Sequence, residues 1–382
     1  MHHDLPTGTS QASLLHVVAL ALAAMSAGSG AFLALPRASV DSGRAVVLPA
    51  TSAPAPSSPP GVPIAAPSPP SVGSGSLAAV DEDEPTTLAA QRTRLFARMR
   101  DALKLGDEAM AKVEQVFTAS PHLGQGNPAI SKHPMTRAEC RAARAAAKVD
   151  DADDPRCNAP GMVAIPVVGE PASAAKVCID RLEFPGIACE YPVVNVRSSE
   201  ASDLCRAVGK RLCDAHEWEG ACAGGARSPE DEYLFPRARP EVTQQHNTVR
   251  EKVWAYGPER DLGRCATGSR VTPGCPGGGW DLCGSNTYPT GAFPACRSSL
   301  GVYDQHGNVA EHMSLPRTPE ELGSRGGLGD TEMKGSWFVF AATPAHEDDC
   351  HWRAPAWHAS RVDAPSSHKN YHLGFRCCRD VE

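Results

Sequence analysis

The sequence GKRLCDAHEWE, residues 209–219, marks the point where one predicted helix ends and the next begins. Its first glycine directly follows a predicted helix over 199–208, and glycine commonly ends helices because it accepts a left-handed backbone. Asp214 with Glu217 three residues later has the pattern of a capping box, which predicts a second helix over 214–223.

Two further motifs follow in the same order along the chain, GVYDQHGNVAE at 301–311 and GFR at 374–376. In order and spacing, the three motifs resemble the formylglycine-generating enzyme family, also called sulfatase-modifying factors, over roughly residues 160–380. The cysteine content further resembles a bacterial, cysteine-rich branch that ends in Gly-Phe-Arg-Cys-Cys. The resemblance implies an α+β fold of the C-type-lectin-like kind, rich in loops and stapled by disulfides.

The second motif contains a candidate metal loop. Asp304 and Glu311 bracket a glycine that permits a sharp turn, and hard cations such as calcium take carboxylate and backbone carbonyl oxygens. The resemblance implies a structural calcium ion held by the side chain of Asp304, the carbonyls of Gly307 and Val309, and the carboxylate of Glu311. Asp-rich turns that bind no metal are the alternative interpretation.

The resemblance also implies a copper site made of two cysteine thiolates five residues apart. Counting along the family pattern places Asp348 and Arg353 at these positions, and Cys350 is the nearby thiol that remains. Since soft thiolates suit Cu(I), their loss disfavours copper or iron as a cofactor. Ala310 and His312 also replace two tryptophans of the family, which should remove an aromatic wall near the substrate groove.

The chain has 14 cysteines, all between Cys140 and Cys378. An even number with this distribution predicts disulfides formed in an oxidising compartment. A zinc site is the alternative, but no C-x-x-C pair occurs. The disulfide candidates singled out are Cys140, Cys157, Cys205, Cys213, Cys222, Cys350, Cys377 and Cys378.

Their pairing stays open from sequence, although some partners are favoured. A bridge between Cys140 and Cys157 would close a short loop after a helix that begins at Thr136. Neighbouring cysteines bridge only with strain, so Cys377 and its neighbour should each have a distant partner, and the resemblance favours Cys350 for one of them. The cysteines at 205, 213 and 222 are expected to pair within or near the two helices they flank.

The chain divides into four predicted segments by composition. Residues 1–35 hold a charge-free run from 14 to 35 that fits a cleaved signal peptide or an uncleaved membrane anchor. Residues 36–84 are rich in Pro, Ala and Ser and predict a disordered linker. An apolar stripe predicts helices within 85–158, and 159–382 is the folded domain. The segments place the domain outside the cytoplasm, as a periplasmic, cell-envelope or secreted protein.

Charge and motif content exclude several function classes. The net charge is −7 and no basic stripe occurs, so nucleic acid is not an expected partner. No G-x-S-x-G or H-E-x-x-H motif indicates a hydrolase. Histidines 351, 358, 368 and 372 crowd the C-terminal segment and could bind a transition metal, or form polar surface on a loop.

These observations predict a non-catalytic, calcium-stabilised module that binds a peptide, a glycan or an envelope protein. The alternative is an oxygen-dependent oxidoreductase of the formylglycine-generating or non-haem iron type, acting on a protein or a small molecule. The two hypotheses differ in one feature, because an oxidase needs unpaired soft or imidazole ligands, whereas a binding module can commit every cysteine to a bridge.

Overall fold

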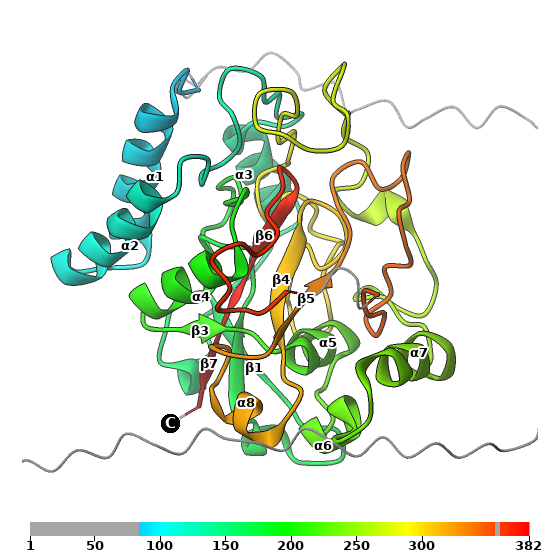
Figure 1. The fold of residues 1–382 in the computed structure, drawn as a ribbon. Coiled ribbons are helices and arrows are strands. Elements are labelled where there is room, and N and C mark those ends of the chain that lie inside the picture. The colour runs from blue at the N-terminus through cyan, green and yellow to red at the C-terminus, as the bar shows by residue number, and fades with distance from the viewer. Residues whose placement is uncertain (1–83, 356–359, 382) are drawn as a thin grey trace, which may run out of the picture. The chain divides into compact units, whose positions relative to one another are not determined.

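The computed structural model describes residues 84–355 and 360–381, and Figure 1 shows their fold. The helices are α1 (Leu88–Ala102), α2 (Asp107–Ala119), α3 (Arg137–Ala146), α4 (Ser198–Ala207), α5 (Ala215–Ala223), α6 (Pro229–Tyr233), α7 (Arg239–Val249) and α8 (Pro319–Gly323). The strands are β1 (Met162–Ile165), β2 (Val177–Asp180), β3 (Arg211–Leu212), β4 (Ala310–Leu315), β5 (Asp330–Lys334), β6 (Leu373–Phe375) and β7 (Cys377–Asp380). This α+β composition, with long loops between short elements, confirms the predicted fold class.

The strands form two small sheets. One has the order β1-β2-β7-β3 with antiparallel pairs throughout. The other has the order β5-β4-β6, in which β4 pairs antiparallel with β5 and parallel with β6. Since β6 and β7 are consecutive, the last residues of the chain join the two sheets. Figure 1 shows this red segment running through the middle of the fold.

The N-terminal helices belong to the same core as the sheets. The apolar stripe is confirmed, because Leu95 and Met99 of α1 and Val113 and Phe117 of α2 are buried. They share one hydrophobic cluster with Phe375 of β6. The helical segment therefore packs onto the domain that follows it.

The predicted helix starts are confirmed in detail. Thr136 caps α3 and Asp214 caps α5, each in a capping box with a glutamate three residues on. α5 ends at Gly224 with φ of 93°, a left-handed conformation that favours glycine. No periodic pattern in the sequence indicates α7 or β4.

All 14 cysteines form disulfides, so the prediction of a disulfide-stapled domain is confirmed. The pairs are Cys140–Cys189, Cys157–Cys178, Cys205–Cys377, Cys213–Cys378, Cys222–Cys350, Cys265–Cys296 and Cys275–Cys283. Disulfides in this number are typical of an oxidising, extracytoplasmic environment.

Several favoured pairings were wrong, and the strands explain why. Cys377 and its neighbour are successive residues of β7, so their side chains point to opposite faces of the sheet. Cys377 bonds to Cys205 of α4, and Cys378 bonds to Cys213, which follows β3. The cysteines near the two helices therefore do not pair with one another. Cys350 therefore bonds to Cys222 rather than to the C-terminal pair.

The proposed bridge between Cys140 and Cys157 was also wrong. Cys157 lies beside β2 and bonds to Cys178 in that strand, while Cys140 of α3 bonds to Cys189. Among the residues that the structure describes, no helix is long and apolar enough to cross a membrane. The predictions for residues 1–83, including the signal or anchor at 14–35, lie outside the described residues.

Candidate functional site

The three sequence motifs meet at one buried salt bridge. The Arg376 guanidinium donates to both oxygens of Glu311, with Nη2 at 2.6 Å from Oε1 and Nε at 2.7 Å from Oε2. Trp218 Nε1 donates to Glu311 Oε2 at 3.1 Å. All three side chains are buried, and each comes from a different motif. The motifs therefore share a structural role at the centre of the domain.

The candidate metal loop leads directly into β4. Asp304 and Gly307 both have left-handed φ values, 58° and 80°. A Cβ at Gly307 would lie 2.7 Å from the backbone of Ala266, so only glycine fits there. Val309 ends the loop, and its N–H donates to Glu183 Oε1 at 3.1 Å.

Buried carboxylates outnumber the cations around this loop. Glu183, Asp304 and Glu311 are all buried, and Arg376 is the cation that interacts with each of them. Burial, with a smaller contribution from Glu311, raises the pKa of Asp304 to about 6. Burial, Asp304 and Glu311 together raise the pKa of Glu183 well above its usual range. Without a bound cation, the charged forms of Glu183 and Asp304 are thus disfavoured in this loop.

Of the two carboxylates that bracket the loop, Asp304 is available to bind a hard cation and Glu311 is not. Asp304 Oδ1 is buried and has no hydrogen-bond partner, so a cation there would satisfy it. Glu311, in contrast, is already committed to Arg376. Among the described residues, the sets of three ligand side chains that lie within 4.8 Å of one another do not include Asp304 with Glu311. Backbone carbonyls would have to complete such a site.

The two positions that the sequence resemblance aligns with copper ligands hold the buried side chains of Asp348 and Arg353. Asp348 accepts from Ser336 Oγ at 3.1 Å and from Trp254 Nε1 at 3.2 Å. Arg353 is fully buried and pairs with Glu219, with Nε at 3.0 Å from Oε1. Each side chain thus satisfies a neighbour inside the protein. Neither can act as a soft metal ligand.

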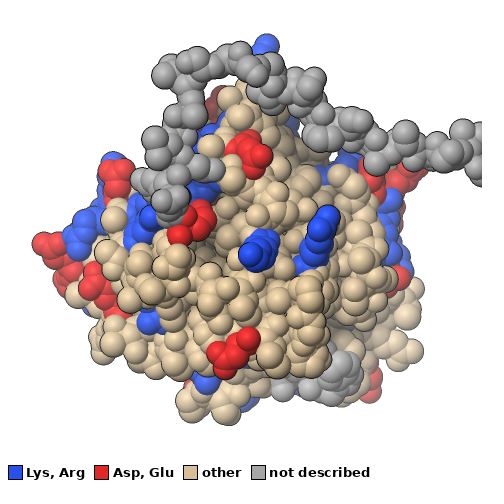
Figure 2. Space-filling model, turned by 90° about the horizontal axis from the view of Figure 1, so that it is seen from above, with Lys and Arg blue, Asp and Glu red and all other residues tan. Residues whose placement is uncertain are grey.

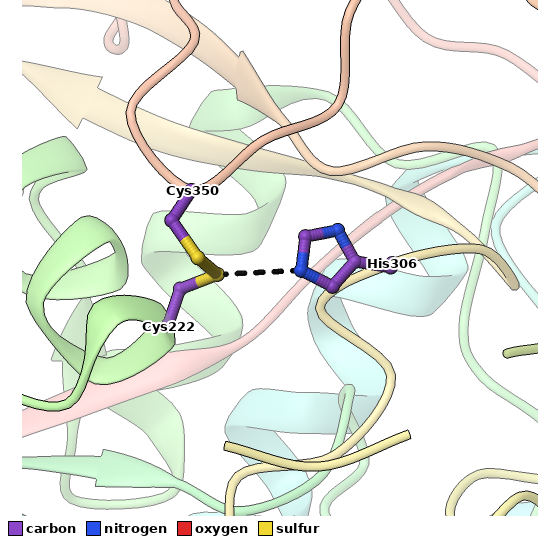
Figure 3. A group of neighbouring side chains, drawn as sticks. All are labelled: Cys222, His306 and Cys350. Atoms are coloured by element: carbon purple, nitrogen blue, oxygen red, sulfur yellow. Dashed lines mark hydrogen bonds between the residues drawn. A yellow bond between two sulfur atoms is a disulfide. The ribbon is translucent and has the colours of Figure 1, made fainter. Parts of the chain in front are cut away.

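Cys350 lies beside a histidine that the sequence analysis did not single out (Figure 3). His306 Nε2 is 3.4 Å from Cys222 Sγ, and it accepts a hydrogen bond from Ala255 N at 2.9 Å. The neutral ring therefore carries its hydrogen on Nδ1, which lies 3.9 Å from Asp348 Oδ2. Burial lowers the pKa of His306 to about 4. The disulfide leaves neither sulfur as a thiolate.

The four C-terminal histidines do not converge on one point. His368 and His372 line a groove, His351 lies apart from it, and His358 falls outside the described residues. Among the part of the chain that the structure describes, none of them joins a set of three mutually close ligand side chains.

A groove of about 340 Å³ adjoins both the metal loop and the Asp348 region. Its lining residues are Ala310, Met333, Ser336, Trp337, Ala345, His346, Trp352, Pro355, His368, Asn370 and His372. Ala310 is the residue before Glu311, and Ser336 donates to Asp348. The groove is therefore built at the N-terminal end of β4 and the start of β6, over the buried polar cluster.

Aromatic rings and neutral imidazoles dominate the groove. The His346 ring stacks on Trp352 with centroids 4.2 Å apart, and His372 meets Trp337 edge-on at 4.4 Å. Burial lowers the pKa of His346, and burial with the neighbouring histidines lowers that of His372 to about 3. These imidazoles are therefore uncharged near neutral pH. The face of the molecule seen in Figure 2 carries isolated basic side chains near its centre, and more charged side chains lie toward its edge.

A larger hollow of about 590 Å³ has a different character. It lies beside β1 and the start of α6, and acidic and basic side chains alternate around it. Arg325 in its wall is already paired with Glu217 at 3.3 Å and with Asp380. Because its charges compensate one another and it does not touch the metal loop, the aromatic groove is the stronger candidate site.

Sequence reasoning missed several residues of this region. Trp337 and Trp352 stand in a segment without periodicity, and Glu183 lies more than a hundred residues before the loop that it contacts. For the two tryptophans, the visible signal was the high aromatic and histidine content of residues 337–372.

Comparison with known proteins gives one match to a family and a weak structural similarity. The family model for the sulfatase-modifying factor enzyme 1-like domain matches residues 127–381. The crystal structure of CarF aligns at 14% sequence identity with a TM-score of 0.34, covering 58% of this chain and 98% of that chain.

Proposed function

The chain belongs to the sulfatase-modifying factor enzyme 1-like domain family, and on that premise we propose that it is a non-catalytic member: an exported, calcium-stabilised binding module. The observation that carries the proposal is the state of the cysteines. All 14 are bonded to one another, so the described domain offers no thiolate for copper.

The residues around Cys350 support the same proposal. Asp348 holds Ser336 and Trp254 in place, and Arg353 neutralises buried Glu219. Breaking such a buried ion pair typically costs about 3–5 kcal/mol. Asp348 and Arg353 therefore contribute to the stability of the fold, as expected of residues that replace metal ligands in a non-catalytic protein.

We propose calcium as the structural cofactor of the loop. Asp304 would bind the ion through its unpartnered oxygen, together with the carbonyls of Gly307 and Val309. Glu311 would contribute its negative charge while remaining paired with Arg376. A bound cation would stabilise the excess carboxylate charge, and the ion would have no part in a reaction.

The aromatic groove is the proposed binding site for an exported partner: a peptide, a glycan or an envelope protein. It is concave, largely apolar and contains a few polar groups, which is the usual character of a ligand site. The seven disulfides support a location outside the cytoplasm, and residues 14–35 would direct export or attach the chain to a membrane.

The proposal is tested by an oxidase assay on the full chain. Purified protein is supplied with Cu(I), oxygen and a cysteine-containing sulfatase peptide, with a formylglycine-generating enzyme as the positive control. We expect no oxygen uptake, no aldehyde product and no titratable thiol in denaturant. Copper-dependent conversion of the peptide would refute the non-catalytic role.

A second candidate function rests on one observation. Cys222, Cys350 and His306 bring two sulfurs and an imidazole within 4.8 Å of one another. Reduction of the disulfide would turn this group into a possible soft-metal site of an oxygen-dependent oxidoreductase. Protein treated with a phosphine reductant and then titrated with Cu(I) would distinguish the two functions. Binding of one copper with recovered oxidase activity favours the second.

A further inference from the structure

We infer that the aromatic groove binds a neutral oligosaccharide. This inference rests on the proposed binding function and names its ligand class. Among the described residues that line the groove, none is Lys, Arg, Asp or Glu, so these residues offer no counter-charge to an anionic or cationic ligand. It offers two indoles instead, from Trp337 and Trp352. Apolar ring faces edged by uncharged polar groups suit a ligand with the same alternation, such as a pyranose.

Trp337 provides the accessible platform. It is half-buried, whereas Trp352 is only 9% exposed and is covered by the stacked His346 ring. The Trp337 ring is held in place, because its Nε1 donates to Thr343 O at 3.2 Å and His372 packs against it edge-on. A rigid, oriented indole loses little conformational entropy on binding, so it is suited to serve as an anchor.

The polar groups of the groove match hydroxyl groups. A neutral imidazole carries one donor and one acceptor, and the amide of Asn370 carries both kinds as well. His372 Nδ1 is buried without a hydrogen-bond partner. Sugar hydroxyls both donate and accept, so they can pair with such groups in either sense. Phosphate or carboxylate ligands would instead need the charge-assisted donors that the groove lacks.

A third indole, from Trp280, extends the site beyond one sugar. Gly278 borders Asn370, since a Cβ there would lie 3.9 Å from Asn370 Oδ1. The glycine-rich loop around it is closed by the disulfide Cys275–Cys283. Two residues further on, the half-buried Trp280 stacks on His122 with centroids 4.8 Å apart and planes at 5°. An oligosaccharide that runs from the groove over Gly278 would reach Trp280.

The experiment uses the full chain in calcium buffer. It is first applied to an array of neutral and anionic oligosaccharides and to a peptide library. Chitohexaose, cellohexaose and maltohexaose are then titrated by calorimetry and tryptophan fluorescence, with their disaccharides alongside and a heparin hexasaccharide as the anionic comparison. We expect a neutral hexasaccharide to bind.

The variants locate that binding. Trp337→Ala should weaken every saccharide by about tenfold or more, the range for an aromatic anchor. Trp280→Ala should weaken the hexasaccharide and leave the disaccharide unchanged. Leu282→Ala is the matched control, because this side chain is 55% exposed in the same disulfide loop and lies outside the groove lining. It should change neither affinity.

The outcomes separate the inference from the function on which it rests. Binding of a peptide or an anionic glycan that Trp337→Ala abolishes would overturn the neutral saccharide and leave the binding module intact. Saccharide binding that is insensitive to Trp337→Ala would overturn the site. If neither the array nor the library yields a ligand, both the inference and the proposed function fail.

Discussion

The substitution Glu311→Gln probes the salt bridge where the three motifs meet. It keeps the shape of the side chain and lets Trp218 still donate to an oxygen, but it removes the charge that balances buried Arg376. Removing one partner of a buried pair typically costs about 3–5 kcal/mol. Because Asp304 and Glu183 remain near Arg376 and partly replace the lost charge, we expect a loss near the lower end of that range.

Replacing the cation of this salt bridge should lower the free energy of unfolding more than replacing Glu311. Arg376→Met leaves Glu183, Asp304 and Glu311 buried together without their shared cation. In chelator, the free energy of unfolding of the Arg376→Met variant should fall further than that of Glu311→Gln. Added calcium should restore more of it, because the ion then supplies the missing positive charge. Glu108→Gln on the surface of α2 is the control and should leave the transition unchanged.

Urea unfolding at neutral pH, followed by tryptophan fluorescence with calcium in excess or with chelator, measures these differences. At about 2–4 °C per kcal/mol, Glu311→Gln should also lower the melting temperature by on the order of 10 °C. A loss of less than about 1 kcal/mol, the usual value of an exposed pair, would refute the structural role assigned to this bridge.

Two further predictions concern calcium and the disulfides. The pKa of Asp304 is raised to about 6, so between pH 4 and 6 the folded state binds more protons than the unfolded chain. In chelator, stability should therefore fall as pH rises through this interval, and urea titrations should show that calcium or Asp304→Asn flattens the slope; an unchanged slope in Asp304→Asn contradicts the assignment. When Cys205 and Cys377 are replaced by serine, the neighbouring bridge Cys213–Cys378 stays closed, so only the short stretch between the two bridges is released, and we expect a loss of about 2.5 kcal/mol, similar to that for Cys275 and Cys283 with a loop of 8. Losses in thermal unfolding that differ by more than about 2 kcal/mol would show that strain or packing, rather than loop entropy, sets these values.

The helices could be predicted because their signals are local. The capping boxes at Thr136 and Asp214 and the stripe through Leu95 and Phe117 need only residues a few positions apart. β4 gave no such signal. Its residues AEHMSL are all buried, so they show no alternation, and they include Glu311, whose partner Arg376 comes from the end of the chain.

The candidate site could be predicted only in part, because many of its contacts join residues that are far apart in the sequence. The motifs identified the loop at Asp304, but the carboxylate of Glu183 reaches it only through the tertiary fold. Disulfide partners depend on which face of β7 each cysteine occupies and on the strand that lies beside it. The groove combines Trp337 with side chains from β4 and the C-terminal segment, so its aromatic lining becomes visible only when these segments pack together.

Metal content of the full chain tests the central claim most directly. The protein is exported to an oxidising compartment, purified without chelators and measured by elemental mass spectrometry. A non-catalytic, calcium-stabilised module predicts calcium at about one or two ions per chain, without stoichiometric copper or iron. Stoichiometric copper or iron would contradict it and would direct attention to Cys222, Cys350 and His306 as the ligands of a working oxidase.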